Sequence, residues 1–184
     1  MQIAEKKLNS KMLFIFSLSI VYSYSACDFK AKLGTKKAVF EKLEITGTPL
    51  PSEYENFYIY GVLAEDVCPS ENLEDVAIEY KFINDELIAI NQIALNDYTN
   101  QVSEKLTLMN YVKRNYGDFD TSNNPKSYIG FEVIEKVNEF IIYQRLLNDD
   151  ATIDEQVYIS NPEQDNKFME YVKNLEEQQL KEEQ

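Results

Sequence analysis

The chain contains no histidine, and this absence limits the chemistry that it can perform. Ser-His-Asp and Cys-His nucleophilic systems use an imidazole as general base, and His-based zinc sites use it as a ligand. The sequence also lacks a Ser-x-x-Lys pair. Its five glycines stand singly, so no glycine-rich loop is present to hold the phosphates of a nucleotide. We therefore expect a protein that is not an enzyme of these classes and that carries no cofactor.

Carboxylates are the remaining catalytic candidates, because the chain holds 32 Asp and Glu residues. A glycosidase needs only two of them, an acid and a base or nucleophile, placed across a cleft. No spacing in the sequence singles out such a pair, and acidic residues lie mostly on solvated surfaces. A carboxylate-dependent enzyme therefore ranks third, after a protein-binding role and a ligand-carrier role.

One loop carries four alternating oxygen-bearing side chains, as at the start of a calcium-binding loop: Asp118, Asp120, Ser122 and Asn124. The pattern then departs from such a loop. Asn123 occupies the position of the glycine that permits the sharp turn, and Ile129 occupies that of the glutamate that completes the ligand shell. We interpret the segment as a polar loop, with these four residues as weak candidates for a cation.

Residues 1–26 have the features of a secretory signal peptide. Three lysines precede an uncharged stretch over residues 12–22, and small residues follow at Ser23, Ser25 and Ala26. The apolar stretch is shorter than the roughly 20 residues that cross a membrane. We expect an exported protein, periplasmic or secreted, with an uncleaved membrane anchor as the alternative.

The two cysteines, Cys27 and Cys68, permit two outcomes in an oxidising compartment. A single disulfide between them is the simple expectation. Alternatively, residues 24–27 resemble a lipoprotein box, in which Cys27 would be lipidated and would tether the protein to a membrane. Tyr24 departs from that box, since a small branched aliphatic residue is usual there. Lipidation would also prevent the disulfide and leave Cys68 alone.

The net charge favours a basic partner. The whole chain carries −14, and residues 1–26 contribute three Lys and one Glu, so the remainder carries −14 − 2 = −16. Such a protein repels nucleic acid and anionic lipid, and it attracts basic proteins or cations. Solubility alone is the other explanation of the charge.

Aromatic residues gather just before the middle of the chain, where Phe57 lies among Tyr54, Tyr58 and Tyr60. Tyrosines are enriched at protein interfaces, so these three are the candidate partner-binding residues. A strand would turn about half of this cluster inward, so a place in the core is the alternative.

Runs rich in apolar, aromatic and β-branched residues, which alternate with polar ones over 38–45 and 76–82, predict strands over 38–45, 57–64, 76–82, 87–95, 128–135, 140–147 and 152–159. An apolar stripe at spacings of three and four predicts a helix over 102–116, with Thr99 or Asn100 at its start and Gly117 at its end. A second helix begins at Asn161 and Pro162. Its predicted buried stripe is Phe168, Val172 and Leu175.

This order, β-β-β-β-α-β-β-β-α, predicts a single α+β domain over residues 27–180. We expect a mainly antiparallel sheet covered by two helices on one face, followed by a frayed acidic tail at 181–184. From the second strand pair onward, the succession of a helix, a meander and a helix begun by Pro162 resembles the PsbP-like fold of some exported and lipid-tethered proteins. The resemblance covers roughly the last 110 residues and implies no functional residue. Cystatin-like and nuclear-transport-factor-like sheets are alternatives.

Together these features indicate a non-enzymatic binding protein of the bacterial cell envelope. We expect it to engage a basic protein partner through an acidic face, as an immunity or inhibitor protein would. The alternative is a carrier or scaffold lipoprotein that holds a small apolar ligand or lipid between the sheet and its helices.

Overall fold

The computed structural model describes residues 27–45, 47–52 and 54–182. The expected signal peptide, residues 1–26, lies outside these ranges, as do residues 183–184 of the expected tail. Seven strands are present: β1 (Thr48–Leu50), β2 (Phe57–Leu63), β3 (Val76–Ile83), β4 (Glu86–Ala94), β5 (Gly130–Glu135), β6 (Phe140–Leu147) and β7 (Ile153–Ser160). The helices are α1 (Lys37–Phe40), α2 (Ala64–Val67), α3 (Gln101–Glu104), α4 (Thr107–Asn115) and α5 (Pro162–Glu182), with a 3-10 turn at Pro125–Ser127.

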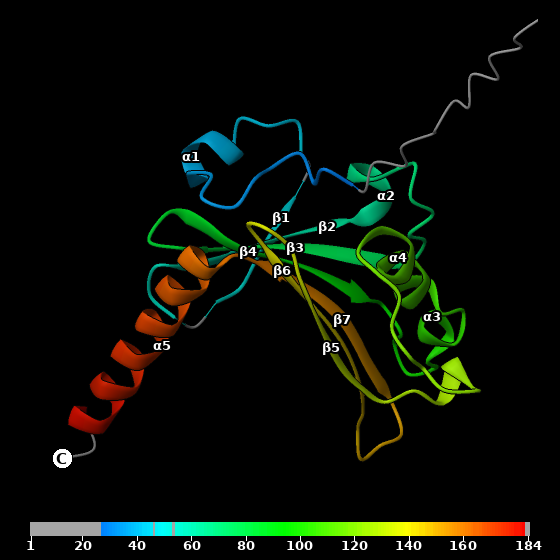
Figure 1. The fold of residues 1–184 in the computed structure, drawn as a ribbon. Coiled ribbons are helices and arrows are strands. Elements are labelled where there is room, and N and C mark those ends of the chain that lie inside the picture. The colour runs from blue at the N-terminus through cyan, green and yellow to red at the C-terminus, as the bar shows by residue number, and fades with distance from the viewer. Residues whose placement is uncertain (1–26, 46, 53, 183–184) are drawn as a thin grey trace, which may run out of the picture.

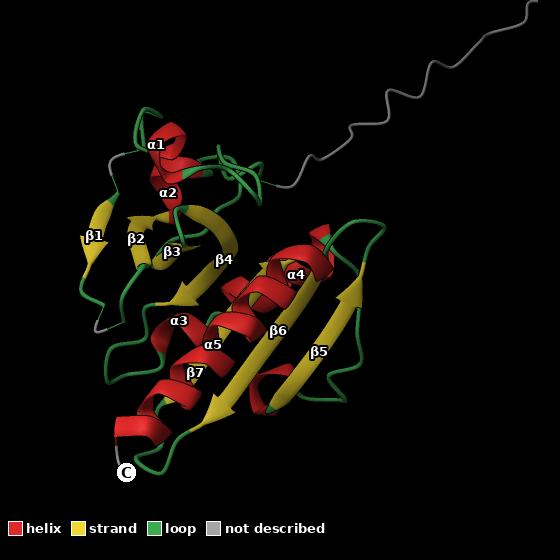
Figure 2. Cartoon of the chain, turned by 90° about the vertical axis from the view of Figure 1, so that its left-hand side faces the viewer, coloured by secondary structure: helices red, strands yellow, loops and turns green. Residues whose placement is uncertain are grey.

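The strands form one antiparallel sheet in the order β1-β2-β3-β4-β7-β6-β5 (Figures 1 and 2). This confirms the predicted α+β class and antiparallel sheet. The meander β5-β6-β7 joins the first four strands through the pairing of β7 with β4. The sheet therefore ends at β1 on one side and at β5 on the other.

The hairpin β3–β4 follows the prediction closely. Asn84 and Asp85 both have positive φ, at 47° and 65°, which is the conformation of a tight type I′ turn. The apolar face of β3, which consists of Val76, Ile78, Tyr80 and Phe82, is fully buried. Strand β4 is buried on both faces, and a bulge sets Lys81 opposite Ala89 but Phe82 opposite Leu87. Ile88 is thus the extra residue, and it joins Ala89 in a second apolar cluster on the opposite face of the sheet.

We predicted that the helices cover one face of the sheet, and this prediction is wrong. The second cluster gives the sheet an apolar surface on its other face, and a helix covers it. Helix α4 packs its Leu108, Met109 and Val112 into the main core. Helix α5 lies on the other face, where Phe168 and Tyr171 pack against the cluster that contains Ile88. In Figure 2, α5 crosses in front of β7 while β5 lies clear of it.

The strand predicted over 38–45 is wrong. Residues 37–40 form α1 and a turn follows. Phe40 is buried, whereas its neighbour Val39 is 53% exposed. The Phe40 ring lies 4.8 Å from that of Tyr80 and 5.1 Å from that of Phe82. Packing against these distant aromatic residues overrides the weak local alternation.

The single helix predicted over 102–116 is broken into α3 and α4 by Leu106, whose φ is +58°. Its predicted stripe still points inward, and Gly117 follows its end with a φ of +147°. Asn100 does not cap α3 with its side chain. Its side chain instead binds the Ala151 carbonyl and the Ile153 amide and thereby ties the helix to β7.

Helix α5 begins as predicted, because the Asn161 side chain accepts a hydrogen bond of 2.9 Å from the Gln164 amide. It continues to Glu182, two residues beyond the expected boundary at Leu180. Its stripe of Phe168, Val172 and Leu175 is only half-buried, however. Figure 1 shows the reason, since α5 leans away from the sheet toward its C-terminal end.

Candidate functional site

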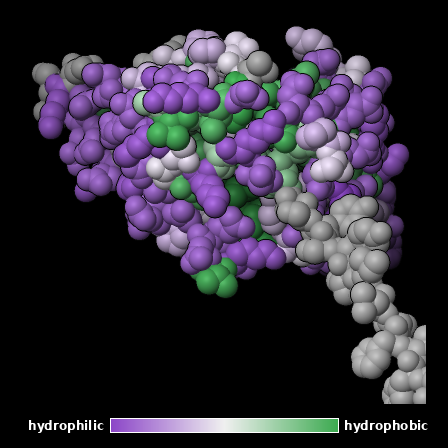
Figure 3. Space-filling view, turned by 90° about the horizontal axis from the view of Figure 1, so that it is seen from above, coloured by the Kyte–Doolittle hydropathy of each residue, from purple (hydrophilic) through white to green (hydrophobic). Residues whose placement is uncertain are grey.

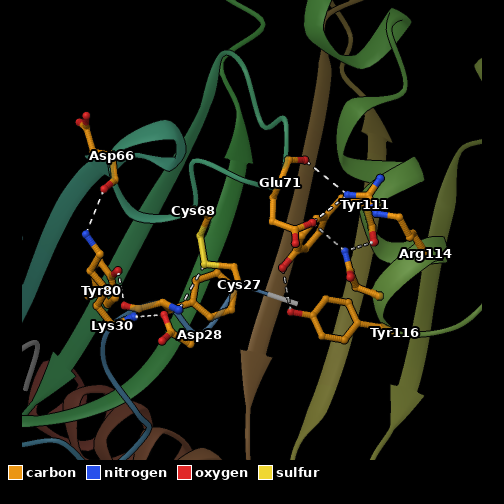
Figure 4. Close-up of a disulfide and its surroundings, with 12 residues drawn as sticks. Cys27, Asp28, Lys30, Asp66, Cys68, Glu71, Tyr80, Tyr111, Arg114 and Tyr116 are labelled. Atoms are coloured by element: carbon orange, nitrogen blue, oxygen red, sulfur yellow. Dashed lines mark hydrogen bonds and ion pairs between the residues drawn. A yellow bond between two sulfur atoms is a disulfide. The ribbon is translucent and has the colours of Figure 1, made fainter. Parts of the chain in front are cut away.

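A disulfide joins Cys27 to Cys68, with a Cα–Cα distance of 5.4 Å, and it confirms the predicted pairing (Figure 4). Cys68 is buried and directly follows α2. The bridge therefore holds the first described residue of the chain against the loop between α2 and β3. A disulfide is compatible with an exported protein.

The segment that begins at Cys27, residues 27–36, runs over the core, and we call it the strap. The hydroxyl of Tyr80 donates to the Phe29 carbonyl at 2.7 Å, and Lys30 donates to the Asp66 carbonyl at 3.2 Å (Figure 4). Farther along, Leu87 exchanges backbone hydrogen bonds with Gly34 and Thr35. Burial raises the pKa of Tyr80, so its hydroxyl stays protonated and remains a donor. The strap is thus fixed at several points besides the disulfide.

Beside the disulfide, Glu71 is a buried carboxylate with two partners. Arg114 donates to it at 2.8 Å and Asn115 at 3.2 Å (Figure 4). A buried charge is costly unless it is paired and hydrogen-bonded, and here it is both. The neighbouring hydroxyls of Tyr111 and Tyr116 lie 3.3 Å apart, and burial raises the pKa of both. This cluster therefore fastens α4 to the loop that carries Cys68.

A hollow of about 410 Å³ lies between the strap and the turn that joins β5 to β6. Phe29, Leu33 and Ile159 supply apolar walls, and Asn138 and Glu139 come from the turn. Viewed from above, this end of the molecule exposes hydrophobic atoms amid hydrophilic ones (Figure 3). A small apolar molecule is the ligand that such walls would suit.

A second hollow, of about 340 Å³, follows α5, and we call it the α5 groove. It is lined by Tyr54, Phe57, Phe168, Tyr171, Val172, Leu175, Glu176 and Gln179. The rings of Phe57 and Tyr171 stack with centroids 6.2 Å apart, and the Tyr171 hydroxyl donates to the Glu55 carbonyl at 2.7 Å. These contacts hold α5 against the start of β2 beside the groove.

The three predicted partner-binding tyrosines do not form one surface. Tyr54 is 50% exposed and lines the α5 groove. Tyr58 and Tyr60 lie in β2 and point to the opposite face, where Lys37 lies 4.3 Å above the Tyr58 ring. The hydroxyl of Tyr60 donates to Glu41 at 2.7 Å, and burial together with this bond raises the pKa of Tyr60 to about 12. Of the three, Tyr54 is the one that lines the α5 groove.

The cation candidates are engaged in local hydrogen bonds. Lys113 binds Asp118 at 3.0 Å, and Asp120 accepts the Ser122 amide at 2.8 Å. Asn124 accepts the Lys126 amide in the same way, at 3.3 Å. Within residues 27–45, 47–52 and 54–182, no group of three or more His, Cys, Asp or Glu residues is arranged to hold a metal ion.

Two buried ionisable residues, Arg145 and Glu155, were not among the predicted site residues. Arg145 and Glu155 are opposite each other on β6 and β7, and both are buried on the face that α4 covers. The Tyr143 hydroxyl donates to Glu155 at 2.7 Å, and burial raises the pKa of Glu155. The alternation of Ile141, Tyr143 and Arg145 along β6 was a signal that could have revealed them. Neither residue lines the two hollows described above.

None of the helices in the described part of the chain has both the length and the apolar character needed to cross a membrane. No known protein family, curated protein or solved structure matches this chain.

Proposed function

We propose that this is an exported, non-enzymatic binding protein that engages a basic protein partner through the α5 groove. The observation that carries the proposal is the half-exposed stripe of α5. A helix normally buries its apolar stripe against its own domain. Here Val172 and Leu175 face a groove of about 340 Å³.

The groove has the chemistry of a protein-binding site. Its walls are aromatic and aliphatic, and Tyr54 adds an exposed ring at the rim. Aromatic residues are enriched where proteins meet, because they bury a large area and keep a polar tip for hydrogen bonding. One well-buried leucine or phenylalanine from a partner would contribute about 1.5–3 kcal/mol.

Charge selects the kind of partner. Glu176 lines the groove, and Glu170 and Glu177 stand exposed on the same helix. Lys167 is bound to Glu86 and Glu163, and Lys173 is bound to Glu177, so these lysines offset only part of the negative charge of the helix. With a charge of −16 beyond residue 26, the protein attracts basic surfaces from a distance and repels acidic ones. The occupant that fits is a segment with apolar anchors flanked by Lys or Arg.

The placement outside the cytoplasm rests on the sequence of residues 1–26 and on the disulfide. An immunity or inhibitor protein of the cell envelope is the concrete form of this proposal.

A paired binding experiment tests the groove. The probes are two labelled peptides with identical leucine positions, one carrying Lys and the other Glu at the remaining sites. We expect the Lys peptide to bind and to weaken as salt is added, and the Glu peptide not to bind. Leu175→Glu should reduce binding at least about tenfold. Leu180→Glu is the matched control, because Leu180 lies on the same helix, is 60% exposed and does not line the groove. Equal loss in both variants, or equal binding of both peptides, would refute the groove as the site.

The hollow between the strap and the turn that joins β5 to β6 favours a second function, that of a carrier for a small apolar ligand. Its volume of about 410 Å³ falls within the range of ligand sites, and Ile90 adds to its apolar walls. Native mass spectrometry of the freshly purified protein tests this. A reproducible additional small mass, lost when Leu33 is replaced by Glu, is the expected result for a carrier, whereas a bare chain would count against it.

A further inference from the structure

The two edges of the sheet differ in how they are protected against pairing. An edge strand exposes unpaired backbone groups, and proteins commonly protect it with short length, proline, lysine or a bulge. Strand β1 follows this rule, because it has only three residues, with Pro49 inside it and Pro51 directly after it. One end of the sheet is therefore closed to further strands.

Strand β5, at the other edge, has none of these four features, although it carries two acidic side chains, Glu132 and Glu135. It is six residues long, contains neither proline nor lysine, and pairs with β6 without a bulge. Among the described residues, its backbone hydrogen bonds go to β6 alone. The loop after α4 packs Phe119 against Tyr128 and Tyr143, so it covers the face of the sheet beneath α4. Figure 2 shows the other face of β5 free of α5.

Apart from Glu135, the side chains of this edge are apolar on the free face. Exposure alternates along residues 128–135, so Ile129, Phe131 and Val133 share one face, with exposed fractions of 45%, 65% and 52%. On the adjacent strand, Leu146 is 40% exposed on that same face. An exposed apolar group of this kind on a soluble protein marks an interaction surface.

We propose that β5 pairs with β5 of a second copy of this chain, antiparallel and about a two-fold axis at Phe131. In this register Phe131 lies opposite Phe131 of the second copy, and Ile129 lies opposite Val133. Glu132 falls beside Gly130, which has no side chain. Aromatic and β-branched cross-strand pairs stabilise sheets, and a two-fold axis is the commonest symmetry of dimers.

Neighbouring registers are less favourable because of their charges. Centring the axis on Glu132 sets the two Glu132 carboxylates directly opposite each other, which destabilises a strand pair. Centring it on Val133 sets Phe131 opposite Glu135. The register at Phe131 therefore joins the apolar residues and separates the acidic ones, which is the complementarity that a pairing of two identical strands requires.

The proposal is independent of the α5 groove, and salt distinguishes the two. Two copies of a chain that carries −16 beyond residue 26 repel each other, so salt should strengthen the dimer. Binding of a basic partner should weaken under the same conditions. Failure of one proposal therefore leaves the other unaffected.

Sedimentation of the purified protein at about 100 µM tests the dimer. We expect a dimer whose dissociation constant rises at least about tenfold in Phe131→Lys and in Val133→Lys. Val137→Lys should leave it unchanged, since Val137 is 97% exposed at the turn after β5 but lies outside the paired segment. A monomer at this concentration, or an equal loss in the control, would overturn the proposal. A chain that stays monomeric and pairs β5 with a strand of a different protein would also overturn it.

A cysteine pair tests the register. Residues directly opposite in an antiparallel pair lie about 4.5–5.5 Å apart, which a disulfide can span. Phe131→Cys should therefore form a cross-linked dimer under mild oxidation. Val133→Cys should not form one, because in this register residue 133 of one copy and residue 133 of the other lie several residues apart along the strands. Cross-linking of Val133→Cys in preference to Phe131→Cys would show that the register is wrong.

Discussion

Replacing Cys27 and Cys68 by alanine removes the bridge between the strap and the end of α2. The two residues are 41 positions apart in the sequence. For a loop of this length the chain-entropy relation gives about 13 cal/mol/K, which is about 4 kcal/mol at 25 °C. The loss arises in the unfolded state, because the chain without the bridge gains the freedom that the closed loop denied it.

Urea unfolding, followed by circular dichroism, measures this loss. With a slope of about 2 kcal/mol per molar urea, the midpoint of the double variant should fall by about 2 M. Each single variant should lose as much as the double variant, since either substitution breaks the same bond. Unfolding of the unmodified protein in a thiol reductant should give the same midpoint as the double variant.

A midpoint shift below about 0.5 M would refute the reasoning, because it corresponds to only about 1 kcal/mol. Additive losses in the single variants would refute it in a different way, by showing that each cysteine stabilises the fold through its own packing. Insensitivity to reductant would point instead to a Cys27 that is not bridged, as lipidation would require.

Three further perturbations test other parts of the structure. Hydrogen bonds from Lys167 and Lys36 lower the pKa of Glu86 from 4.5 to about 2. The stability that this carboxylate contributes is therefore present above pH 4.5 and disappears toward pH 2. In urea unfolding, Glu86→Gln should lower the free energy of unfolding by about 1–2 kcal/mol at pH 7 and leave it unchanged near pH 2. Phe40→Ala should lower the free energy of unfolding by about 3–5 kcal/mol, while Val39→Ala should change it little; equal effects would contradict the placement of α1. Asn161→Ala should cost about 1 kcal/mol by the same assay, through loss of the helix cap, and no loss would mean that the cap is not needed.

The elements that sequence reasoning located well are those with strong local signals. Asn84 and Asp85 sit between two apolar runs of strand length, and few conformations other than a tight hairpin suit them. Asn161 followed by Pro162 marks a helix start through a capping oxygen and a fixed φ. In both cases the information lies within a few residues of the element itself.

Elements that depend on distant contacts were not predictable in this way. The segment that forms α1 alternates weakly, and only the packing of Phe40 on Tyr80 and Phe82 selects a helical turn. The division of helices between two faces depends on the bulge at Ile88, for which the run of apolar residues in β4 gave only a faint indication.

In the candidate site, too, features with local signals were predictable, and features that depend on distant contacts were not. Two cysteines in an exported chain have one simple pairing, and that pairing is present. The stripe of α5 was also visible, but its partial exposure depends on the angle at which the helix leaves the sheet. Tyr54 and Tyr58 are only four positions apart, yet they face opposite sides of the molecule, because Tyr54 precedes β2 and Tyr58 belongs to it.

The lean of α5 has a practical consequence for work on the protein. Its first turns are held by Gln164 and Lys167, which bind Glu86, and by Tyr171, which binds the Glu55 carbonyl. Residues 176–181 are all exposed, although Glu176 and Gln179 also line the α5 groove. Amide hydrogen exchange should accelerate along these last turns, since their opening disturbs little else. A fluorescent tag or fusion partner attached after residue 184 should therefore leave the sheet, the disulfide and the β5 edge undisturbed.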